Sequence, residues 1–399
     1  MKSNDIKILD NGWMEVPFSY MAEHISKRVD PKYTDLDIYI GLEHIDPGSL
    51  KIKRYGKPED VKGTKLIAQP GDIIFGKRRA YQGKVGVCEW NAIVSAHSMV
   101  LRPKEENIEI DFLKFFMQSE EFYNRSIQIS EGSLSPTIKW KVLEQQRFLI
   151  PSKDDQIEIV EKISKLDDII ESKKVLIDNT IKYKNKLIKD IFNGKIDICE
   201  HDIYIELNKN KKKLKDVTNI KIGGTPARDV EEYWKPLSEE DSNTWVSIAD
   251  LNGKYIHKTK EVISNEGVKN SNVKLLEKGT VIMSFKLSIG RVAIAQKQLY
   301  TNEAIAGFEI KDRSLSNEYL YYALQVLNFS RLADNAIKGV TLNKAKLEIM
   351  KIPVPYLELQ NKIVDILTKV DEIIEKEMTN LKEYSNLKGR ILNMKLKDK

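Results

Sequence analysis

The sequence predicts an α+β fold, in which two similar mixed α/β domains are separated by two long antiparallel coiled-coil helices and related by a pseudo-two-fold internal repeat. Three observations lead to this prediction. Gln156 and Gln360 lie in matching contexts 204 positions apart (360 − 156), and residues 70–75 are echoed by residues 278–283. Each copy contains short β-like runs, and each closes with a proline-free stretch of heptad spacing.

Composition limits the class of protein. With 399 residues, the chain is long enough for two or three domains with cores. It is 41% hydrophobic and 31% charged, and its net charge of +6 permits nucleic-acid binding without requiring it. The two cysteines, Cys88 and Cys199, are not equivalent positions of the repeat, so we expect neither a disulfide framework nor a zinc site. A cytoplasmic location is expected.

No targeting or membrane segment is expected. The first residues do not resemble a signal peptide, and the sequence has no run of about 18 apolar residues that could cross a bilayer.

The first copy divides into a mixed domain, residues 1–151, and a helical spacer, residues 152–198. Polar residues interrupt short β-like runs at 38–40, 72–75, 84–87 and 98–101, and a helical pattern follows at 110–121. In the spacer, residues recur at 4-3-4-3 spacing, which is typical of a coiled coil. The seam residues are Ile163, Leu166, Ile170, Lys173 and Ile177. A helix over 155–192 would be about 57 Å long, and 193–194 (Asn-Gly) predicts its end.

The second copy repeats this order after a lysine-rich stretch, residues 199–213, which is predicted to be an exposed basic linker. Residues 214–353 form the second mixed domain, with β-like runs at 245–248, 280–283, 291–294 and 306–310 and a helix at 317–328. Residues 354–399 form the second helical spacer. Its seam keeps the register of the first, through Leu367, Val370, Ile374, Glu377 and Leu381.

A two-fold relation between the copies makes the helix pair antiparallel, and equivalent residues near the axis should then face each other. Lys173 and Glu377 are such equivalents with opposite charge, and we hypothesise that they meet. This pair would favour folding within one chain over self-association, where Lys173 would meet Lys173. The alternative is that both side chains are solvated.

No catalytic constellation is recognisable. Residues 71–78 approach a phosphate-binding P-loop, but Arg78 stands where Ser or Thr must hold magnesium. An acidic pair at Glu59 and Asp60 precedes Lys62 without a partner carboxylate, and no methyltransferase motif occurs. The histidines lack metal-ligand spacing. We therefore predict no catalytic residue and no metal site.

Polar and basic side chains gather at matching loop positions of the two copies, which suits DNA. Backbone amides and hydroxyls can donate to phosphate, lysine can neutralise it, and arginine or asparagine can read base edges. In the first copy the candidates are Lys77, Arg78, Arg79, Tyr81, Lys84, Ser133, Ser135, Thr137, Lys139 and Lys141. In the second copy they are Thr225, Arg228, Lys286, Ser288, Arg291, Lys338, Thr341, Asn343 and Lys344. The alternative for any one residue is a solvated hairpin or a helix cap.

These residues resemble the specificity (S) subunit of type I restriction-modification enzymes. The resemblance is strongest in the second copy, in 213–217 (Lys-Leu-Lys-Asp-Val), 223–226 (Gly-Gly-Thr-Pro), 233–234 (Tyr-Trp), 244–251, 279–282, 302–304 and 352–355 with Gln360. The first copy matches in outline at 13–17 and 39–45 but lacks the Gly-Gly-Thr-Pro element. The resemblance covers almost the whole chain.

The resemblance implies a non-catalytic subunit with two target-recognition domains, each reading one half of a split site in double-stranded DNA, held by helices that fix the gap. It also implies two modification (M) subunits and restriction (R) subunits as partners. No cofactor is expected in this chain, since S-adenosylmethionine, ATP and magnesium belong to the partners. Two alternatives remain open: a protein-binding scaffold of two β-rich modules on a coiled coil, and a stand-alone nuclease or methyltransferase.

Overall fold

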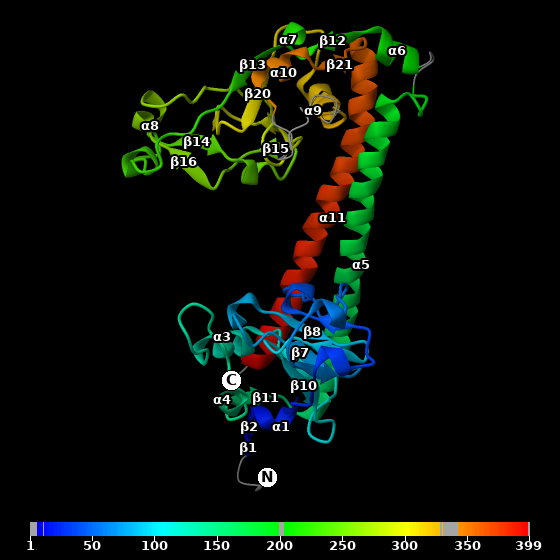
Figure 1. Cartoon of the computed structure of the whole chain (residues 1–399), viewed down its shortest axis with the longest axis vertical. Coiled ribbons are helices and arrows are strands. Elements are labelled where there is room, and N and C mark those ends of the chain that lie inside the picture. The colour runs from blue at the N-terminus through cyan, green and yellow to red at the C-terminus, as the bar shows by residue number, and fades with distance from the viewer. Residues whose placement is uncertain (1–5, 11, 199–202, 328, 330–341, 398–399) are drawn as a thin grey trace. The chain divides into compact units, whose positions relative to one another are not determined.

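The computed structural model describes residues 6–10, 12–198, 203–327, 329 and 342–397. Two compact units divide the chain: residues 1–175 with 378–399 form unit 1, and residues 176–377 form unit 2. Each unit contains a mixed domain and one stretch of each long helix, α5 (Lys153–Phe192) and α11 (Leu357–Lys397) (Figure 1). The predicted fold class is confirmed, because two similar mixed domains are present and the helices run antiparallel within each unit.

Unit 1 contains three antiparallel or mixed sheets. The first has the order β3 (Ala22–Ile25), β10 (Met99–Pro103), β7 (Ile73–Phe75), β8 (Val85–Val87). The second has the order β4 (Arg28–Val29), β6 (Lys65–Ala68), β9 (Ala92–Val94), β5 (Tyr39–Ile40), and the third β1 (Lys7–Ile8), β2 (Met14–Pro17), β11 (Arg147–Ile150). The α-helices are α1 (Phe18–Met21), α2 (Phe112–Phe116), α3 (Glu120–Gln128) and α4 (Trp140–Leu143). Short 3-10 turns lie at Pro31–Tyr33, Leu42–His44, Pro58–Asp60 and Ala80–Gln82.

Unit 2 repeats this plan. Its main sheet has the order β13 (Thr218–Ile222), β20 (Ile305–Ile310), β17 (Val281–Ser284), β18 (Val292–Ala295), β15 (Tyr255–Ile256). The other sheets are β16 (Glu261–Ile263), β14 (Asn243–Val246), β19 (Tyr300–Thr301), and the pair β12 (Lys211–Lys213), β21 (Lys351–Pro353). The α-helices are α6 (Ile203–Lys209), α7 (Leu214–Val217), α8 (Asn265–Lys269), α9 (Asn317–Gln325) and α10 (Lys344–Ile349), with 3-10 turns at Glu231–Tyr233 and Ile248–Asp250. The order β13-β20-β17-β18 matches β3-β10-β7-β8, as a duplicated domain requires.

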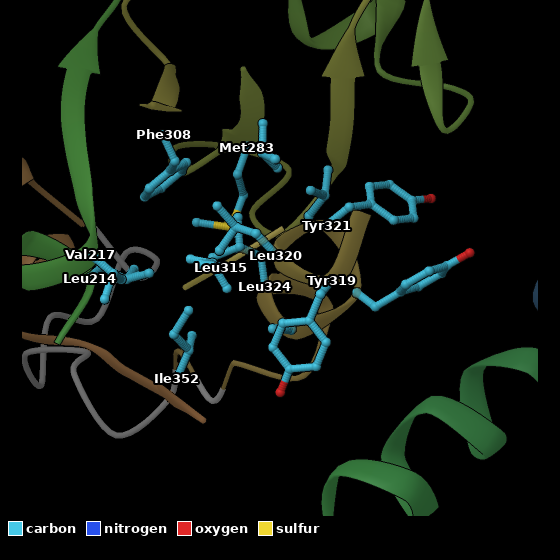
Figure 2. Close-up of a cluster of buried hydrophobic side chains, with 14 of the residues drawn as sticks. Leu214, Val217, Met283, Phe308, Leu315, Tyr319, Leu320, Tyr321, Leu324 and Ile352 are labelled. Atoms are coloured by element: carbon cyan, nitrogen blue, oxygen red, sulfur yellow. The ribbon is translucent and has the colours of Figure 1, made fainter. Parts of the chain in front are cut away.

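An apolar core joins each domain to its stretches of α5 and α11. In unit 2, Met283 and Phe308 from the sheet meet Leu320 and Leu324 from α9 (Figure 2). The same core includes helix residues such as Ile188 and Leu367. In unit 1, aromatic rings dominate, with Phe116 and Phe148 at 5.1 Å between centroids, and Ile163 and Leu392 complete the core. Burial of these side chains is the main force that holds domain and helices together.

The end of α5 follows from its sequence. Gly194 adopts a left-handed φ of 69°, which glycine tolerates without steric cost. Its N–H donates to the Ile191 carbonyl at 2.9 Å, and the Lys195 N–H donates to the Asp190 carbonyl at 2.8 Å. These two bonds form a Schellman motif, which satisfies carbonyls at the helix end. The predicted stop at Asn193-Gly194 is therefore confirmed.

The heptad seams face inward. All ten seam residues named from the sequence are buried or half-buried: Ile163, Leu166, Ile170, Lys173, Ile177, Leu367, Val370, Ile374, Glu377 and Leu381. An ion pair joins the helices in each unit. Lys388 pairs with Asp167 in unit 1, and Lys184 pairs with Asp371 in unit 2. Since 371 − 167 and 388 − 184 both equal 204, the pairs are equivalent under the repeat. The pairing of Lys173 with Glu377 stays a prediction.

A buried glutamine connects each domain to the start of its helix. The Gln156 Oε1 accepts from the Glu109 backbone N–H at 2.9 Å, and its Nε2 donates to the Pro151 carbonyl at 2.9 Å. In unit 2, Gln360 accepts from the Ser316 N–H at 3.1 Å and donates to the Pro355 carbonyl at 2.7 Å. Both glutamine side chains are fully buried. The repeat therefore preserves the joint as well as the fold.

Two local predictions were wrong. Within the predicted exposed linker 199–213, the described residues 203–213 are not simply exposed, because α6 buries Ile203 and Leu207 in the core and β12 pairs with β21. The predicted helix over 110–121 is two helices, α2 and α3. Ser119 causes the break, since its backbone is extended and its hydroxyl accepts from the Phe122 N–H at 3.3 Å, as a helix N-cap does. None of the described helices is both long and apolar enough to span a membrane.

Candidate nucleic-acid interface

Two loops of unit 1 are joined by backbone hydrogen bonds, and both carry predicted site residues. The Arg79 N–H donates to the Pro136 carbonyl at 2.7 Å, and the Ile138 N–H donates to the Lys77 carbonyl at 3.1 Å. An isolated β-bridge pairs Arg78 with Thr137. Residues 77–79 and 135–138, which are far apart in sequence, therefore form one polar surface that we call the unit 1 loop pair.

Side chains tighten this loop pair. The Arg79 Nε donates to the Ser135 Oγ at 3.3 Å. Arg78 Nη1 lies 3.1 Å from His97 Nε2, and Lys139 forms an ion pair with Glu131 at 2.6 Å. These residues keep exposed or half-exposed side chains that can exchange their present partners for phosphate or base edges.

Three basic residues beside the loop pair, His24, Arg28 and His97, were not predicted from the sequence. Burial lowers the pKa of His97, and the positive charges of Arg78 and Lys77 lower it further. Burial also lowers the pKa of His24, with Lys77 and Arg28 adding to the effect. His24 stacks on Trp140 with 5.2 Å between ring centroids. The positive charges that act on the two histidines are those of Arg28, Lys77 and Arg78, and a group of cations on one surface attracts phosphate.

Other predicted residues of unit 1 lie around the pair. Tyr81 is exposed, and its carbonyl accepts from the Tyr123 hydroxyl at 2.8 Å. Lys84 turns inward and donates to the Leu42 carbonyl at 2.5 Å, so it stabilises the loop. Ser133 and Lys141 are exposed.

In unit 2 the equivalent loop, residues 284–291, follows β17. Buried Ser284 closes it: the Ser284 Oγ accepts from the Arg291 N–H at 3.1 Å, and the Gly290 N–H donates to the Ser284 carbonyl at 2.9 Å. The predicted residues Lys286, Ser288 and Arg291 lie on this loop, half-buried or exposed. We call residues 284–291 the unit 2 loop.

The Gly-Gly-Thr-Pro element packs against residues 301–305, where β19 ends and β20 begins. A Cβ at Gly223 would lie 2.2 Å from the Asn302 carbonyl oxygen, so only glycine fits there. The Thr225 hydroxyl donates to Glu303, and this bond lowers the pKa of the Glu303 carboxyl, with Lys286 and Arg228 adding to the effect. Thr225 therefore holds an acidic group near the unit 2 loop.

Arg228 is held by its own neighbours. Its guanidinium lies 3.6 Å from the centroid of the Trp234 ring and makes two hydrogen bonds to Glu261, at 2.5 and 3.2 Å. Trp234 in turn packs edge-on against Trp245. These contacts favour a structural role for Arg228 over direct contact with phosphate.

The remaining predicted residues of the second copy lie at the start of α10 or outside the described residues. Asn343 caps α10, since its Oδ1 accepts from the Lys346 N–H at 2.9 Å, and Lys344 lies on the first turn, 3.9 Å from Glu348. Lys338 and Thr341 lie outside the described residues. Within the described part of the chain, no three His, Cys, Asp or Glu side chains form a metal-binding group, and Cys88 is buried, which raises its thiol pKa to about 11.

Two repeated domains with unlike basic loops define a tandem recognition protein. Residues 22–183 and 206–383 both match the family described as the type I restriction modification DNA specificity domain. The chain belongs to this family. The predicted resemblance is confirmed, including its two-copy layout.

Relatives and solved structures agree with this assignment. The Haemophilus influenzae HindI specificity subunit is 22% identical, covering 96% of this chain and 99% of its own. The putative MjaX specificity subunit of Methanocaldococcus jannaschii is 24% identical, covering 90% and 86%. The MjaIX specificity subunit of the same organism is 32% identical over 41% of this chain, and that match spans only 38% of the relative.

Two solved structures share the fold. A chain described under complex assembly and conformational transition of a type I R-M system has a TM-score of 0.59 at 18% identity, covering 98% of this chain and 99% of its own. The type I S subunit from M. genitalium has a TM-score of 0.54 at 15% identity, covering 100% and 98%.

Proposed function

We propose that this chain is the sequence-reading, non-catalytic subunit of a type I restriction-modification complex and that each unit reads one half of a split site in double-stranded DNA. The observation that carries the proposal is that basic loops stand at equivalent positions of two domains that each match the DNA specificity family. Equivalent loops with unlike side chains suit two different half-sites.

We assign one half-site to the loops of each unit. Arg78, Arg79 and Lys139 serve half-site one, and Lys286, Arg291 and Lys344 serve half-site two. The hydroxyls of Ser133, Ser135, Thr137 and Ser288 supply phosphate contacts that position the duplex. His97 and Arg28 join half-site one, because His97 Nε2 lies 3.1 Å from Arg78 Nη1 and Arg28 lies close enough to Lys77 to add to the lowering of its pKa by burial.

The helices hold the domains and receive partners. Ile169 and Ile373 are equivalent positions on α5 and α11, and both expose their side chains. Two equivalent apolar positions favour two copies of a modification subunit, with restriction subunits joining the complex. S-adenosylmethionine, ATP and magnesium are proposed to bind these partners, in the cytoplasm. The helices also fix the gap between half-sites.

Salt dependence tests the proposal most simply. The chain, assembled with its modification subunits, is titrated with duplex DNA at several salt concentrations. Binding that neutralises phosphates gives a slope of log K against log salt of about −0.9 for each phosphate contacted. A protein-binding scaffold predicts no slope. Assays of the purified chain with magnesium or S-adenosylmethionine are expected to show neither cleavage nor methylation, and activity in either assay would reject the non-catalytic role.

A further inference from the structure

The described residues contain two non-glycine residues with positive φ, Arg79 at 57° and Leu287 at 60°. They are equivalent positions. Gly71 and Gly279 open the matching strands 208 residues apart, and Arg79 and Leu287 are also 208 residues apart (287 − 79). The left-handed conformation is unfavourable for residues other than glycine, asparagine and aspartate, because Cβ comes too close to the carbonyl oxygen, and such outliers cluster at functional sites. The repeat has kept this strained conformation at the tips of both candidate DNA loops.

The unit 2 loop enforces the conformation of Leu287. Phe285 anchors the start of the loop, because its side chain is buried and its N–H donates to the Ala304 carbonyl at 2.9 Å. At the other end, the buried Ser284 bonds to Gly290 and Arg291 as described above. The loop is therefore fixed on both sides of its tip.

The Leu287 side chain does not contribute to the packing of the folded chain. It is 91% exposed, so it buries almost no apolar surface in the fold. Glycine or asparagine would suit the backbone better. Folding therefore gives no reason for a leucine at this position, whereas an apolar ligand group would.

The neighbours of Leu287 indicate the ligand. Lys286 precedes it and Arg291 closes the same loop, so two positive charges flank one apolar tip. Phosphates attract the charges, and the tip then points at the groove between them. In the major groove, the apolar group on a base edge is the C5-methyl of thymine, which apolar side chains can contact. Arg79, at the equivalent tip of unit 1, instead offers a donor fork for guanine.

We propose that Leu287 is a specificity-determining residue that contacts the methyl group of one thymine in half-site two. This inference rests on the proposed DNA-reading function. The contact is apolar, and it adds discrimination to binding that the charged neighbours supply.

Replacing thymine by uracil removes the methyl group alone and so tests the contact. The complex of the chain with its modification subunits is titrated with duplexes in which each thymine of half-site two is replaced in turn. For the wild-type chain, one replacement is expected to weaken binding about fourfold, the value of one buried carbon group at about 0.8 kcal/mol. The Leu287→Asn chain, whose asparagine tolerates positive φ, is expected to bind both duplexes equally.

A matched control exists in the same unit. Leu237 is 97% exposed and lies outside the unit 2 loop, so Leu237→Asn should keep the fourfold difference. Leu287→Gly, which relaxes the backbone, should lose the difference as Leu287→Asn does. Asparagine keeps the left-handed backbone at position 287, whereas glycine frees it. The same loss in Leu287→Asn and Leu287→Gly would therefore show that the effect comes from the missing side chain and not from a change in the loop.

Three results would overturn the inference: no sensitivity of the wild-type chain to any thymine methyl in half-site two, a half-site two without thymine, or a fourfold difference that survives Leu287→Asn. If Leu287→Asn weakened binding to all DNA sequences equally, Leu287 would instead act as a wedge between base pairs. That result would also overturn the inference. In each case, sequence-specific and salt-dependent binding by the wild-type chain would leave the proposed function intact. Absence of such binding would reject the proposed function itself.

Discussion

The side-chain carbonyl of Gln156, at the start of α5, accepts the backbone N–H of Glu109, which lies just before α2, at 2.9 Å. The repeat contains this bond again between Gln360 and Ser316. A fully buried amide that bonds both to its domain and to the proline carbonyl before its helix sets how the helix leaves the domain.

Replacing Gln360 by alanine should lower the free energy of unfolding by about 1–3 kcal/mol, because the half-buried Ser316 N–H and the buried Pro355 carbonyl lose their partner. Urea unfolding followed by circular dichroism measures this change. Gln325→Ala is the control, since Gln325 is partly exposed and its Nε2 bonds only within its own helix, to the Tyr321 carbonyl. Equal effects of the two substitutions would show that the joint adds no stability.

Breaking the ion pair between buried Lys388 and half-buried Asp167 should lower the free energy of unfolding, whereas replacing both residues should change it little. Either Asp167→Leu or Lys388→Met leaves one charge without its partner and should cost up to about 3–5 kcal/mol, whereas the double variant should be close to neutral. A double-mutant cycle on the unfolding free energy measures the coupling. Lys182 and Asp178, an exposed pair one helical turn apart, should show a coupling of about 0.3–0.5 kcal/mol. Similar coupling for both pairs would contradict the argument that the less exposed pair couples more strongly.

Acid should destabilise unit 1 through two histidines. The pKa values of His24 and His97 lie below the ordinary value of 6.5 in the folded protein. The unfolded chain therefore binds more protons as the pH falls below about 6.5, and the free energy of unfolding decreases there. Above that pH, the contribution of these groups is fully present.

The measurement for this prediction is a series of urea unfolding experiments between pH 5 and 7.5. The His24→Gln/His97→Gln chain should lose less stability toward pH 5 than the wild-type chain. Parallel curves for the two proteins would contradict the assigned shifts.

Gly223→Ala should destabilise unit 2, because the added Cβ would lie 2.2 Å from the Asn302 carbonyl oxygen and the backbone must move. Overpacking of this kind costs about 1–3 kcal/mol or more. Gly253→Ala is the matched control, since a Cβ there meets no atom within 4 Å. Thermal unfolding of both variants tests this prediction. Equal melting temperatures would mean that the backbone relaxes at little cost to make room for a Cβ at position 223.

Much of the fold was predictable because it depends on local patterns. Heptad spacing places Ile163 and Leu367 in the cores of their units, and the echo of residues 70–75 at 278–283 anticipates the equivalent strands β7 and β17. The helix break at Ser119 was missed, because apolar periodicity continues across it while the serine hydroxyl acts as a cap.

The candidate site was less predictable, since its contacts join distant segments. Arg228 is a residue type that often binds phosphate, but its guanidinium donates to Glu261 and stacks on Trp234. His97 has no motif, and its place beside Arg78 depends on how the chain turns before β10. The equivalence of Arg79 and Leu287 follows from backbone angles that residue types do not reveal. Which of these side chains touch DNA stays a prediction.

Selection of bound duplexes from a randomised library tests the central claim most directly. The wild-type chain, Arg78→Ala and Lys286→Ala are each assembled with modification subunits, and the selected sequences are compared position by position. The wild-type complex should select a sequence in two separate parts. Arg78→Ala should relax selection in one part only, and Lys286→Ala in the other. Relaxation of the same part by both variants, or a wild-type selection without two parts, would contradict the assignment of one half-site to each unit.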